Sequence, residues 1–162
     1  MTTRERSFQW QDPIQLAEAA KDLSGLSFLR KIAAGELPPP PIGVMMNFGL
    51  DQVEEGRVVF TVEPAEYHYN PIGVVHGGVA ATLLDSAMGC AVHSKLAAGM
   101  FYTTLEIKVN FVRAITRDAG KLYCEANLIH FGSRSATAEG RIIDSSQRLY
   151  AHGTTTCLIQ RP

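Results

Sequence analysis

The chain has 162 residues, of which 46% are hydrophobic and 19% charged, a composition typical of a globular domain with its own core. Fifteen Lys and Arg residues against sixteen Asp and Glu residues leave a formal charge of −1, so no global positive field favours nucleic acid or an anionic membrane surface. The first residues contain no apolar leader-like run, and no uncharged apolar run approaches the ~20 residues that span a bilayer, so we expect a cytoplasmic protein.

The N-terminal part of the chain predicts two short helices followed by a stiff spacer. The first helix is expected over residues 12–22, with Asp12 as its N-cap, and the second over residues 24–35, ended by Gly35. The four prolines Pro38–Pro41 lack backbone donors and therefore predict an extended spacer rather than a helix or a sheet strand.

After the spacer the hydrophobic pattern changes to the period of two that is typical of strands. One segment, residues 78–95, is instead predicted to be a helix. The predicted strands are 43–54, 57–63, 103–112, 121–131, 134–144 and 148–159. Short turns between them favour a mainly antiparallel sheet with the helix lying across it, an α+β fold. We therefore divide the chain into an N-terminal segment, 1–41, and one domain, 42–162.

The clearest of these strands is 103–112, because its residue types alternate strictly. One face is expected to carry Leu105, Ile107, Val109 and Phe111, and the other Glu106, Lys108 and Asn110. Such alternation predicts a strand with one apolar face.

The predicted helix carries one carboxylate in an otherwise uncharged run. On a helical wheel, Asp85 lies on a strip of small residues that includes Gly78, Ala81 and Gly89. A desolvated carboxylate is costly unless a partner, water or a function accounts for it. Two interpretations stay open: a structural Asp85 that is hydrogen-bonded to its surroundings, or a catalytic base or nucleophile.

The turn into this helix has a composition that can serve catalysis. Gly77 and Gly78 leave free backbone N–H groups beside the positive end of the helix dipole, where an oxygen that develops negative charge is stabilised. Asn70 in the preceding loop can orient a carbonyl or a water. The alternative is a purely structural role, in which the two glycines let the loop turn into the helix.

The spacing of these residues resembles a known family. The residues that carry the resemblance are Asn70, Gly73, His76, Gly77, Gly78 and Asp85, supported by 35-GELP-38, 132-GSRS-135 and 148-RLYAHGTTT-156. Together, from about Leu26 to Leu158, they are similar to the PaaI-type (phenylacetate-pathway) branch of the hot-dog-fold acyl-CoA thioesterases. The resemblance implies a long central helix wrapped by a five- or six-stranded antiparallel sheet, and a homodimer or homotetramer.

The resemblance also implies catalytic roles. The Gly77 N–H would polarise the thioester carbonyl, and Asp85, contributed across the dimer interface, would activate water or attack directly. Asn70 would help to position the water or the carbonyl. His76 would either brace the loop or donate to the carbonyl.

Further residues follow from the same resemblance. A hydroxyl on the strand after the helix would assist, with Thr104 at that place and Thr103 as the alternative. The residues expected to meet the coenzyme A phosphates are Gly132, Ser133, Arg134 and Ser135, with Arg113 as a weaker candidate. The alternative for Arg134 is a solvated charge at a strand end that does not bind coenzyme A.

No cofactor or metal is expected, since coenzyme A is part of the substrate. The five histidines include no pair spaced i,i+4 and no cysteine at ligand spacing, so a zinc site is not predicted. The three cysteines, Cys90, Cys124 and Cys157, lie far apart in apolar contexts and are expected to be reduced, buried thiols.

The predicted function is hydrolysis of a small aromatic or short- to medium-chain acyl-CoA to the free acid and coenzyme A. Three alternatives remain: a hot-dog hydratase or dehydratase, a non-catalytic acyl-CoA-binding module, and a purely structural oligomerisation domain. The sequence does not identify the acyl group.

Overall fold

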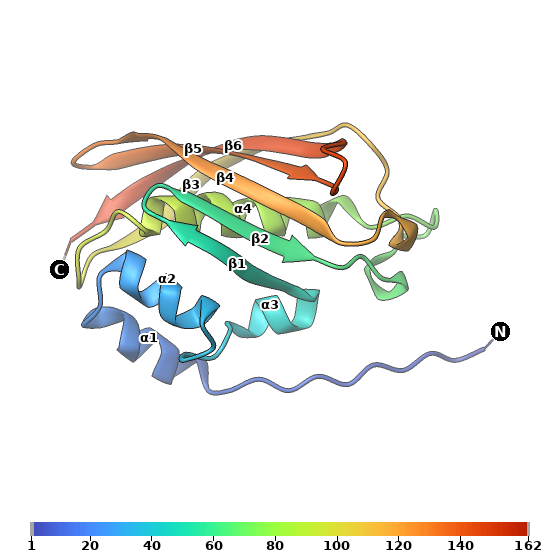
Figure 1. Ribbon diagram of the computed structural model, residues 1–162, viewed down its shortest axis with the longest axis horizontal. Coiled ribbons are helices and arrows are strands. Elements are labelled where there is room, and N and C mark those ends of the chain that lie inside the picture. The colour runs from blue at the N-terminus through green and yellow to red at the C-terminus, as the bar shows by residue number, and fades with distance from the viewer. Residues whose placement is uncertain (1, 162) are drawn as a thin grey trace.

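The computed structural model describes residues 2–161, in which a long helix lies against one antiparallel sheet (Figure 1). The helices are α1 (Pro13–Lys21), α2 (Gly25–Ala33), α3 (Pro41–Met46) and α4 (Gly77–His93), with short 3-10 turns η1 (Glu66–His68) and η2 (Arg117–Ala119). The strands are β1 (Phe48–Glu54), β2 (Arg57–Val62), β3 (Phe101–Phe111), β4 (Leu122–Phe131), β5 (Ser135–Ile143) and β6 (Leu149–Gln160). The sheet order is β1-β2-β4-β5-β6-β3, with every pair antiparallel. The predicted α+β class is confirmed.

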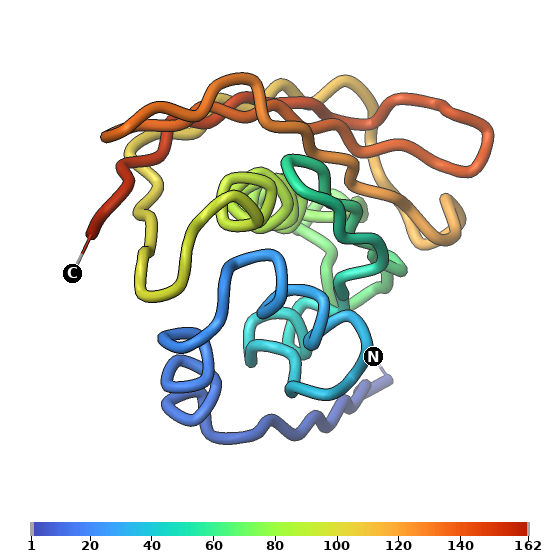
Figure 2. Tube along the Cα trace, turned by 60° about the vertical axis from the view of Figure 1, so that its left-hand side comes forward, coloured from blue at the N-terminus to red at the C-terminus, as the bar shows by residue number. Residues whose placement is uncertain are grey.

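The two predicted N-terminal helices are also confirmed, and each has a side-chain N-cap. The carboxylate of Asp12 accepts the N–H of Ile14 at 2.9 Å, and the hydroxyl of Ser24 accepts the N–H of Ser27 at 3.3 Å. In the view of Figure 2, α4 lies between the sheet and these N-terminal helices. The helix is therefore covered on two sides.

The predicted strand at 43–54 is wrong in its first part, because residues 41–46 form helix α3. Pro41 stands at the start of this helix, where a fixed φ and a missing N–H cost nothing. Asn47 ends the helix in the left-handed conformation (φ 56°), and β1 begins at the next residue. The extended spacer is therefore one residue shorter than predicted.

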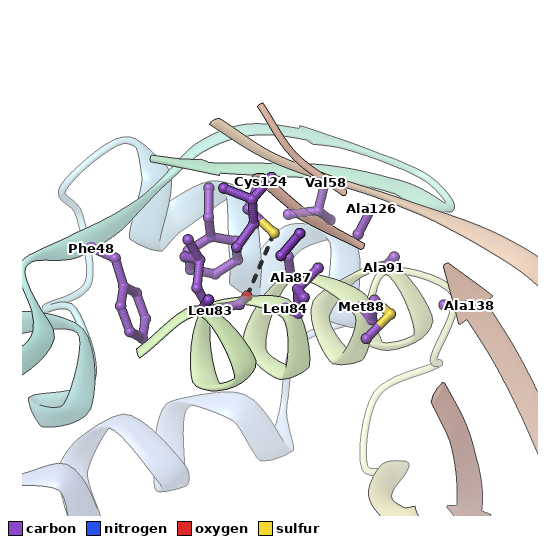
Figure 3. Close-up of a cluster of buried hydrophobic side chains, with 14 of the residues drawn as sticks. Phe48, Val58, Leu83, Leu84, Ala87, Met88, Ala91, Cys124, Ala126 and Ala138 are labelled. Carbon is purple, nitrogen blue, oxygen red and sulfur yellow. Dashed lines mark hydrogen bonds between the residues drawn. The ribbon is translucent and has the colours of Figure 1, made fainter. Parts of the chain in front are cut away.

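The core fills the space between α4 and the sheet (Figure 3). Leu83, Leu84 and Ala87 of α4 are almost completely buried, as is Ala126 of β4. The Cys124 thiol of β4 lies 3.7 Å from the Leu83 carbonyl and donates to it, which ties the helix to the sheet. All three cysteines are free; Cys124 and Cys157 are buried and Cys90 is half-buried.

Strand β3 forms one edge of the sheet and leaves large apolar side chains exposed. Leu105 and Phe111 are 58% and 59% exposed in the single chain. The strict alternation expected here is interrupted by a β-bulge between Thr104 and Glu106, so Leu105 has no pairing partner on β6. Beyond the bulge Ile107 pairs with buried Thr155 of β6, and Ile107 itself is 37% exposed in the single chain.

Within residues 2–161, no helix combines the length and the apolar character needed to cross a bilayer.

Candidate active site

Helix α4 begins at a cap that leaves one backbone amide free. The N-cap is His76, whose Nδ1 accepts the N–H of Gly78 at 2.9 Å while its carbonyl accepts the N–H of Val79 at 2.9 Å. The N–H of Gly77, between them, has no partner among the described residues. The His76 side chain therefore caps α4 and shapes the turn that carries Gly77.

The preceding loop is shaped by Asn70. Its Oδ1 accepts the N–H groups of Ile72 at 3.0 Å and Val74 at 3.4 Å, and Gly73 adopts a positive φ of 81° within the turn. The Asn70 amide NH₂ has no partner in the part of the chain that the structure describes. The side-chain oxygen of Asn70 is therefore occupied by the loop, and only its NH₂ group remains to meet a ligand.

One face of α4 is not covered by the core. We call it the open face; its residues are exposed or half-buried, and they are Gly78, Ala81, Thr82, Asp85, Ser86, Cys90 and His93. Asp85 lies near the middle of this face, and the Thr104 hydroxyl of β3 donates to its Oδ1 at 3.0 Å. The structure thus brings Thr104 to Asp85, whereas Thr103 is exposed and pairs with Leu158.

The β-bulge explains why Thr104 has this position. Without an extra residue, strict alternation would place Thr104 on the same face as Glu106, away from α4. The bulge between these two residues lets Thr104 pair with buried Cys157, so its side chain lies on the helix side. The Thr155 hydroxyl donates to the Glu106 carbonyl at 2.7 Å, which satisfies a backbone oxygen at this irregular place.

A pocket of about 280 Å³ lies beside the free amide of Gly77. Its lining includes His76, Gly77, Phe111 and Arg113. The Arg113 guanidinium lies 5.9 Å from the centre of the Tyr150 ring, so a positive charge stands at this pocket. The structure therefore brings the candidate carbonyl donor and one candidate phosphate contact to the same place.

The free amide and the carboxylate are far apart within one chain. Gly77 and Asp85 are eight residues apart on α4, which corresponds to about 12 Å along the helix axis. A carbonyl whose oxygen meets a donor and whose carbon meets a nucleophile needs both groups about 3 Å away. Gly77 and Asp85 of the same chain cannot serve one carbonyl.

The candidate coenzyme-binding segment lies away from the pocket beside Gly77. Residues 132–135 form the turn between β4 and β5, where the Gly132 N–H donates to the Ser135 carbonyl at 2.9 Å. Ser133, Arg134 and Ser135 are exposed. Ser135 pairs with Leu158 of β6, which pairs with Thr103, so this turn lies toward the end of β3 that holds Thr104.

Titratable groups near Asp85 are in their neutral forms. Burial, together with the nearby Asp85 carboxylate, raises the pKa of the Cys90 thiol to about 12. Burial also raises the pKa of the Tyr102 hydroxyl well above its usual value. Cys90 is therefore a thiol at neutral pH and has little nucleophilic character.

The residues that the structure describes contain no group of three or more His, Cys, Asp or Glu side chains able to hold a metal ion.

Two features of this site were not predicted from the sequence. His76 as an N-cap gave no signal, because helix caps are usually Ser, Thr, Asp, Asn or Gly. Tyr102 lies against the helix at Gly89, where an added Cβ would collide with its hydroxyl. Its place two residues before Thr104 on β3 could have indicated that it faces α4.

Comparisons with known proteins agree with the fold described above. Residues 72–151 match the thioesterase superfamily. The chain is 25% identical over 122 residues to a 1,4-dihydroxy-2-naphthoyl-CoA hydrolase of Listeria monocytogenes serotype 1/2a (strain 10403S); the match covers 74% of this chain and 98% of the relative.

Solved structures share the fold. A phenylacetic acid degradation-related protein from Ralstonia eutropha JMP134 superposes with a TM-score of 0.73 at 24% identity, over 80% of this chain and 98% of the other. A conserved protein from Pseudomonas aeruginosa superposes with a TM-score of 0.71 at 27% identity, over 75% and 95%. With its central helix and six-stranded antiparallel sheet, the chain has the hot-dog fold, and its residues 72–151 are similar to the thioesterase superfamily.

Proposed function

We propose that this protein is a cytoplasmic acyl-CoA thioesterase of the PaaI-type branch, which hydrolyses the thioester of a small aromatic or short- to medium-chain acyl-CoA. One observation carries the proposal: a half-buried carboxylate, Asp85, lies on an uncovered face of α4 with a hydroxyl donor, Thr104, already on one of its oxygens. The similarity to a relative whose name describes a CoA-ester hydrolase supports it.

The chemistry needs one base or nucleophile and one donor for the carbonyl oxygen. The free N–H of Gly77, at the positive end of the α4 dipole, stabilises the oxygen as it gains negative charge. Asp85 removes a proton from water, or attacks the carbonyl carbon itself, while Thr104 holds the carboxylate in place. The carbon–sulfur bond then breaks and coenzyme A leaves. When Asp85 acts as a base, the proton that it took from water passes to the leaving sulfur. When Asp85 attacks, water then hydrolyses the anhydride formed with Asp85, which releases the free acid and supplies the proton for the thiolate.

The distance between Gly77 and Asp85 makes a second copy of the chain part of this proposal. Because about 12 Å separates them within one chain, the carboxylate that serves a given Gly77 comes from another copy. The edge strand β3, with Leu105 and Phe111 exposed, is the surface for such pairing.

Antiparallel pairing of two β3 edges also brings the correct ends together. Gly77 lies at the Phe111 end of β3, since a Cβ on Gly77 would lie 3.2 Å from the Phe111 ring, whereas Asp85 lies at the Thr104 end. In a two-fold antiparallel pair, the Phe111 end of one strand lies beside the Thr104 end of the other. Gly77 of one copy then approaches Asp85 of the other, in a homodimer that can pair further into a tetramer.

The same symmetry accounts for the separation of the coenzyme-binding candidates. The 132–135 turn lies toward the Thr103 end of its own β3, so in the dimer it lies on the side of the other copy's Gly77 and Arg113. Coenzyme A would then be held by Arg113 from one copy and by Arg134 and its neighbours from the other. Guanidinium groups suit the phosphates, because each can donate two hydrogen bonds at once.

The test is hydrolysis of a panel of acyl-CoAs, followed with a thiol reagent, by the wild type and by Asp85→Asn. Asn keeps the shape and one acceptor for Thr104, so we expect a folded variant whose kcat falls by at least ~10²-fold while a non-hydrolysable acyl-CoA analogue still binds. Thr156→Val, on the outer face of β6, is a matched control and should keep wild-type activity.

The alternatives give different results in the same assay. A non-catalytic binding module would bind acyl-CoA without releasing thiol, and a hydratase would change the acyl group without releasing thiol. A structural Asp85 would give a less stable variant with near-normal kcat in its folded fraction, and the catalytic assignment would then be wrong.

A further inference from the structure

The first residues of the chain form an extended segment that runs past α3 before α1 begins (Figure 1). We call residues 4–10 the N-terminal strap. Its aromatic residues Phe8 and Trp10 are exposed, and they border hollows of about 550 Å³ and 310 Å³ instead of a filled core. The strap is therefore not held by continuous packing, and its polar contacts decide where it lies.

Arg6 makes the contacts that fix the strap. Its Nη1 and Nη2 atoms donate to the carbonyls of Met45 at 2.7 Å and Val44 at 3.0 Å, in the last turn of α3. The last carbonyls of a helix lack the usual intrahelical partners, and the planar guanidinium can satisfy two of them at once. The same guanidinium lies over the ring of Tyr67 in η1, 3.9 Å from its centre. Arg6 therefore joins the end of α3 to η1.

His68 continues this connection within η1. The ring of Tyr67 lies against the ring of His68, with the two centres 4.4 Å apart. The Nδ1 atom of buried His68 accepts the N–H of Ala65 at 3.1 Å, which leaves Nε2 as the donor to the Met46 carbonyl at 3.0 Å. Arg6 and His68 together therefore fix η1 to the end of α3.

η1 is bonded directly to the turn that carries the candidate carbonyl donor. The His68 carbonyl accepts the N–H of His76 at 2.8 Å, and His76 is the N-cap of α4, one residue before Gly77. Because the Gly77 N–H lies in the peptide plane that links it to His76, a shift of His76 redirects this N–H. A short series of contacts therefore leads from Arg6 to the Gly77 amide.

We propose that Arg6 is a positioning residue for the Gly77 amide. It holds η1 in place and, through the His68 carbonyl, holds the His76 turn where the Gly77 N–H meets the thioester oxygen. This inference rests on the proposed thioesterase function, and it extends the site to the N-terminal strap. A donor that points away from a developing oxyanion stabilises it less, so loss of Arg6 lowers turnover without removing any atom that touches the substrate.

The first test is the kcat and KM of Arg6→Ala for acyl-CoA. We expect kcat to fall by at least ~5-fold, because small errors in the placement of a reacting group are costly, while KM stays within about twofold since coenzyme A is held elsewhere. Arg4→Ala is the matched control. Arg4 lies in the same strap and pairs with exposed Glu66 at 2.5 Å, a type of surface contact that contributes little, so its kcat should equal that of the wild type. Unchanged kcat in Arg6→Ala, or an equal fall in Arg4→Ala, would overturn the inference.

A double-mutant cycle tests whether Arg6 acts through the Gly77 amide. Gly77→Pro removes this N–H, so Arg6→Ala has no amide left to misplace and should change the kcat of Gly77→Pro by less than ~2-fold. An Arg6 that only stabilised the fold would instead lower Tm and reduce the activity by the same factor in both backgrounds. An equal loss in the two backgrounds would therefore overturn the inference.

Hydrogen exchange separates this inference from the proposed function, because it needs no substrate. In Arg6→Ala the amides of residues 66–78 should exchange at least ~5-fold faster than in the wild type, whereas the amides of β5 should not change, and Arg4→Ala should change neither. Faster exchange of residues 66–78 without hydrolysis of any acyl-CoA would overturn the thioesterase proposal and leave the hold of Arg6 on the turn standing. Hydrolysis with unchanged exchange would overturn the inference alone. Unchanged exchange without hydrolysis would overturn both.

Discussion

Replacing Gly77 by proline removes the one N–H that the proposed mechanism needs and changes little else. Gly77 is the first residue of α4, a position where proline is favoured because its N–H would be unpaired and its φ suits the helix. The preceding residue, His76, already has the extended backbone (φ −60°, ψ 132°) that a following proline requires. The new Cβ would lie 3.2 Å from the Phe111 ring, whose end is exposed and can move.

The expected effect follows from the role of the amide. Removing one donor to a developing oxyanion typically lowers kcat by 10²–10³-fold, about 2.7–4 kcal/mol, and we expect that range for Gly77→Pro. Because no described residue accepts from this N–H, unfolding stability should change by less than about 1 kcal/mol. Gly77→Ala is the matched control: it adds the same Cβ against Phe111 but keeps the N–H, so its kcat should stay within a few-fold of the wild type.

Mixed dimers then test whether the site is shared. When Gly77→Pro and Asp85→Asn chains carry different affinity tags, dimers with one chain of each kind can be purified. In a shared site, one of their two sites combines the intact Gly77 with the intact Asp85, so about half of the wild-type kcat per dimer should return. If each site were built within one chain, neither would be intact.

Mixed dimers with no more activity than either parent would refute the shared site. Gly77→Pro with wild-type kcat would refute the role of the amide.

Three further predictions concern stability and the coenzyme. Burial lowers the pKa of His68 below its ordinary value of 6.5, so the neutral ring's contribution to folding stability is fully present above about pH 6.5 and is lost as the pH falls below that value. The Tm should therefore drop between pH 7 and pH 5. A Tm that does not change over this range would contradict the prediction. Gly25→Ala would place a methyl group against the His93 carbonyl and should lower the free energy of unfolding in urea by about 1–3 kcal/mol. Gly49→Ala, where the new methyl group has open space, should lower it by less. Equal effects of the two substitutions would contradict the packing argument. Arg134→Ala should raise KM for acyl-CoA and leave kcat largely unchanged. KM should rise less for a pantetheine thioester, which lacks the phosphates. An equal loss of activity on both substrates would mean that Arg134 supports the fold.

Local signals predicted the parts of the fold that depend on neighbouring residues. Asp12 and the small-residue pattern around Asp85 placed α1 and α4 within one or two residues, because caps and helical periodicity are properties of short segments. Helix α3 was missed because its prolines indicated an extended chain, although proline equally suits the first turn of a helix.

The parts of the candidate site that were not predicted depend on contacts distant in sequence. The choice between Thr103 and Thr104 depends on a bulge against β6, and nothing near these residues marks an extra residue at Leu105. The closeness of Tyr102 to Gly89 likewise follows from how β3 crosses α4. The alternation of side chains along a strand predicts which sheet face each residue lies on only where the strand has no bulge.

The exposed β3 edge has a consequence for how the protein matures in a cell. If two copies pair through β3 as proposed, a newly folded chain presents a row of unpaired backbone groups beside Leu105 and Phe111 until it meets its partner. The last assembly step is then bimolecular and slows at low protein concentration. The bulge at Leu105 bends and twists this edge, which disfavours the addition of a regular strand from an unrelated chain. The second copy carries the same bulge, related by the two-fold axis of the proposed dimer. The extra residue that turns Thr104 toward Asp85 therefore also protects the β3 edge from unrelated strands before the two copies assemble.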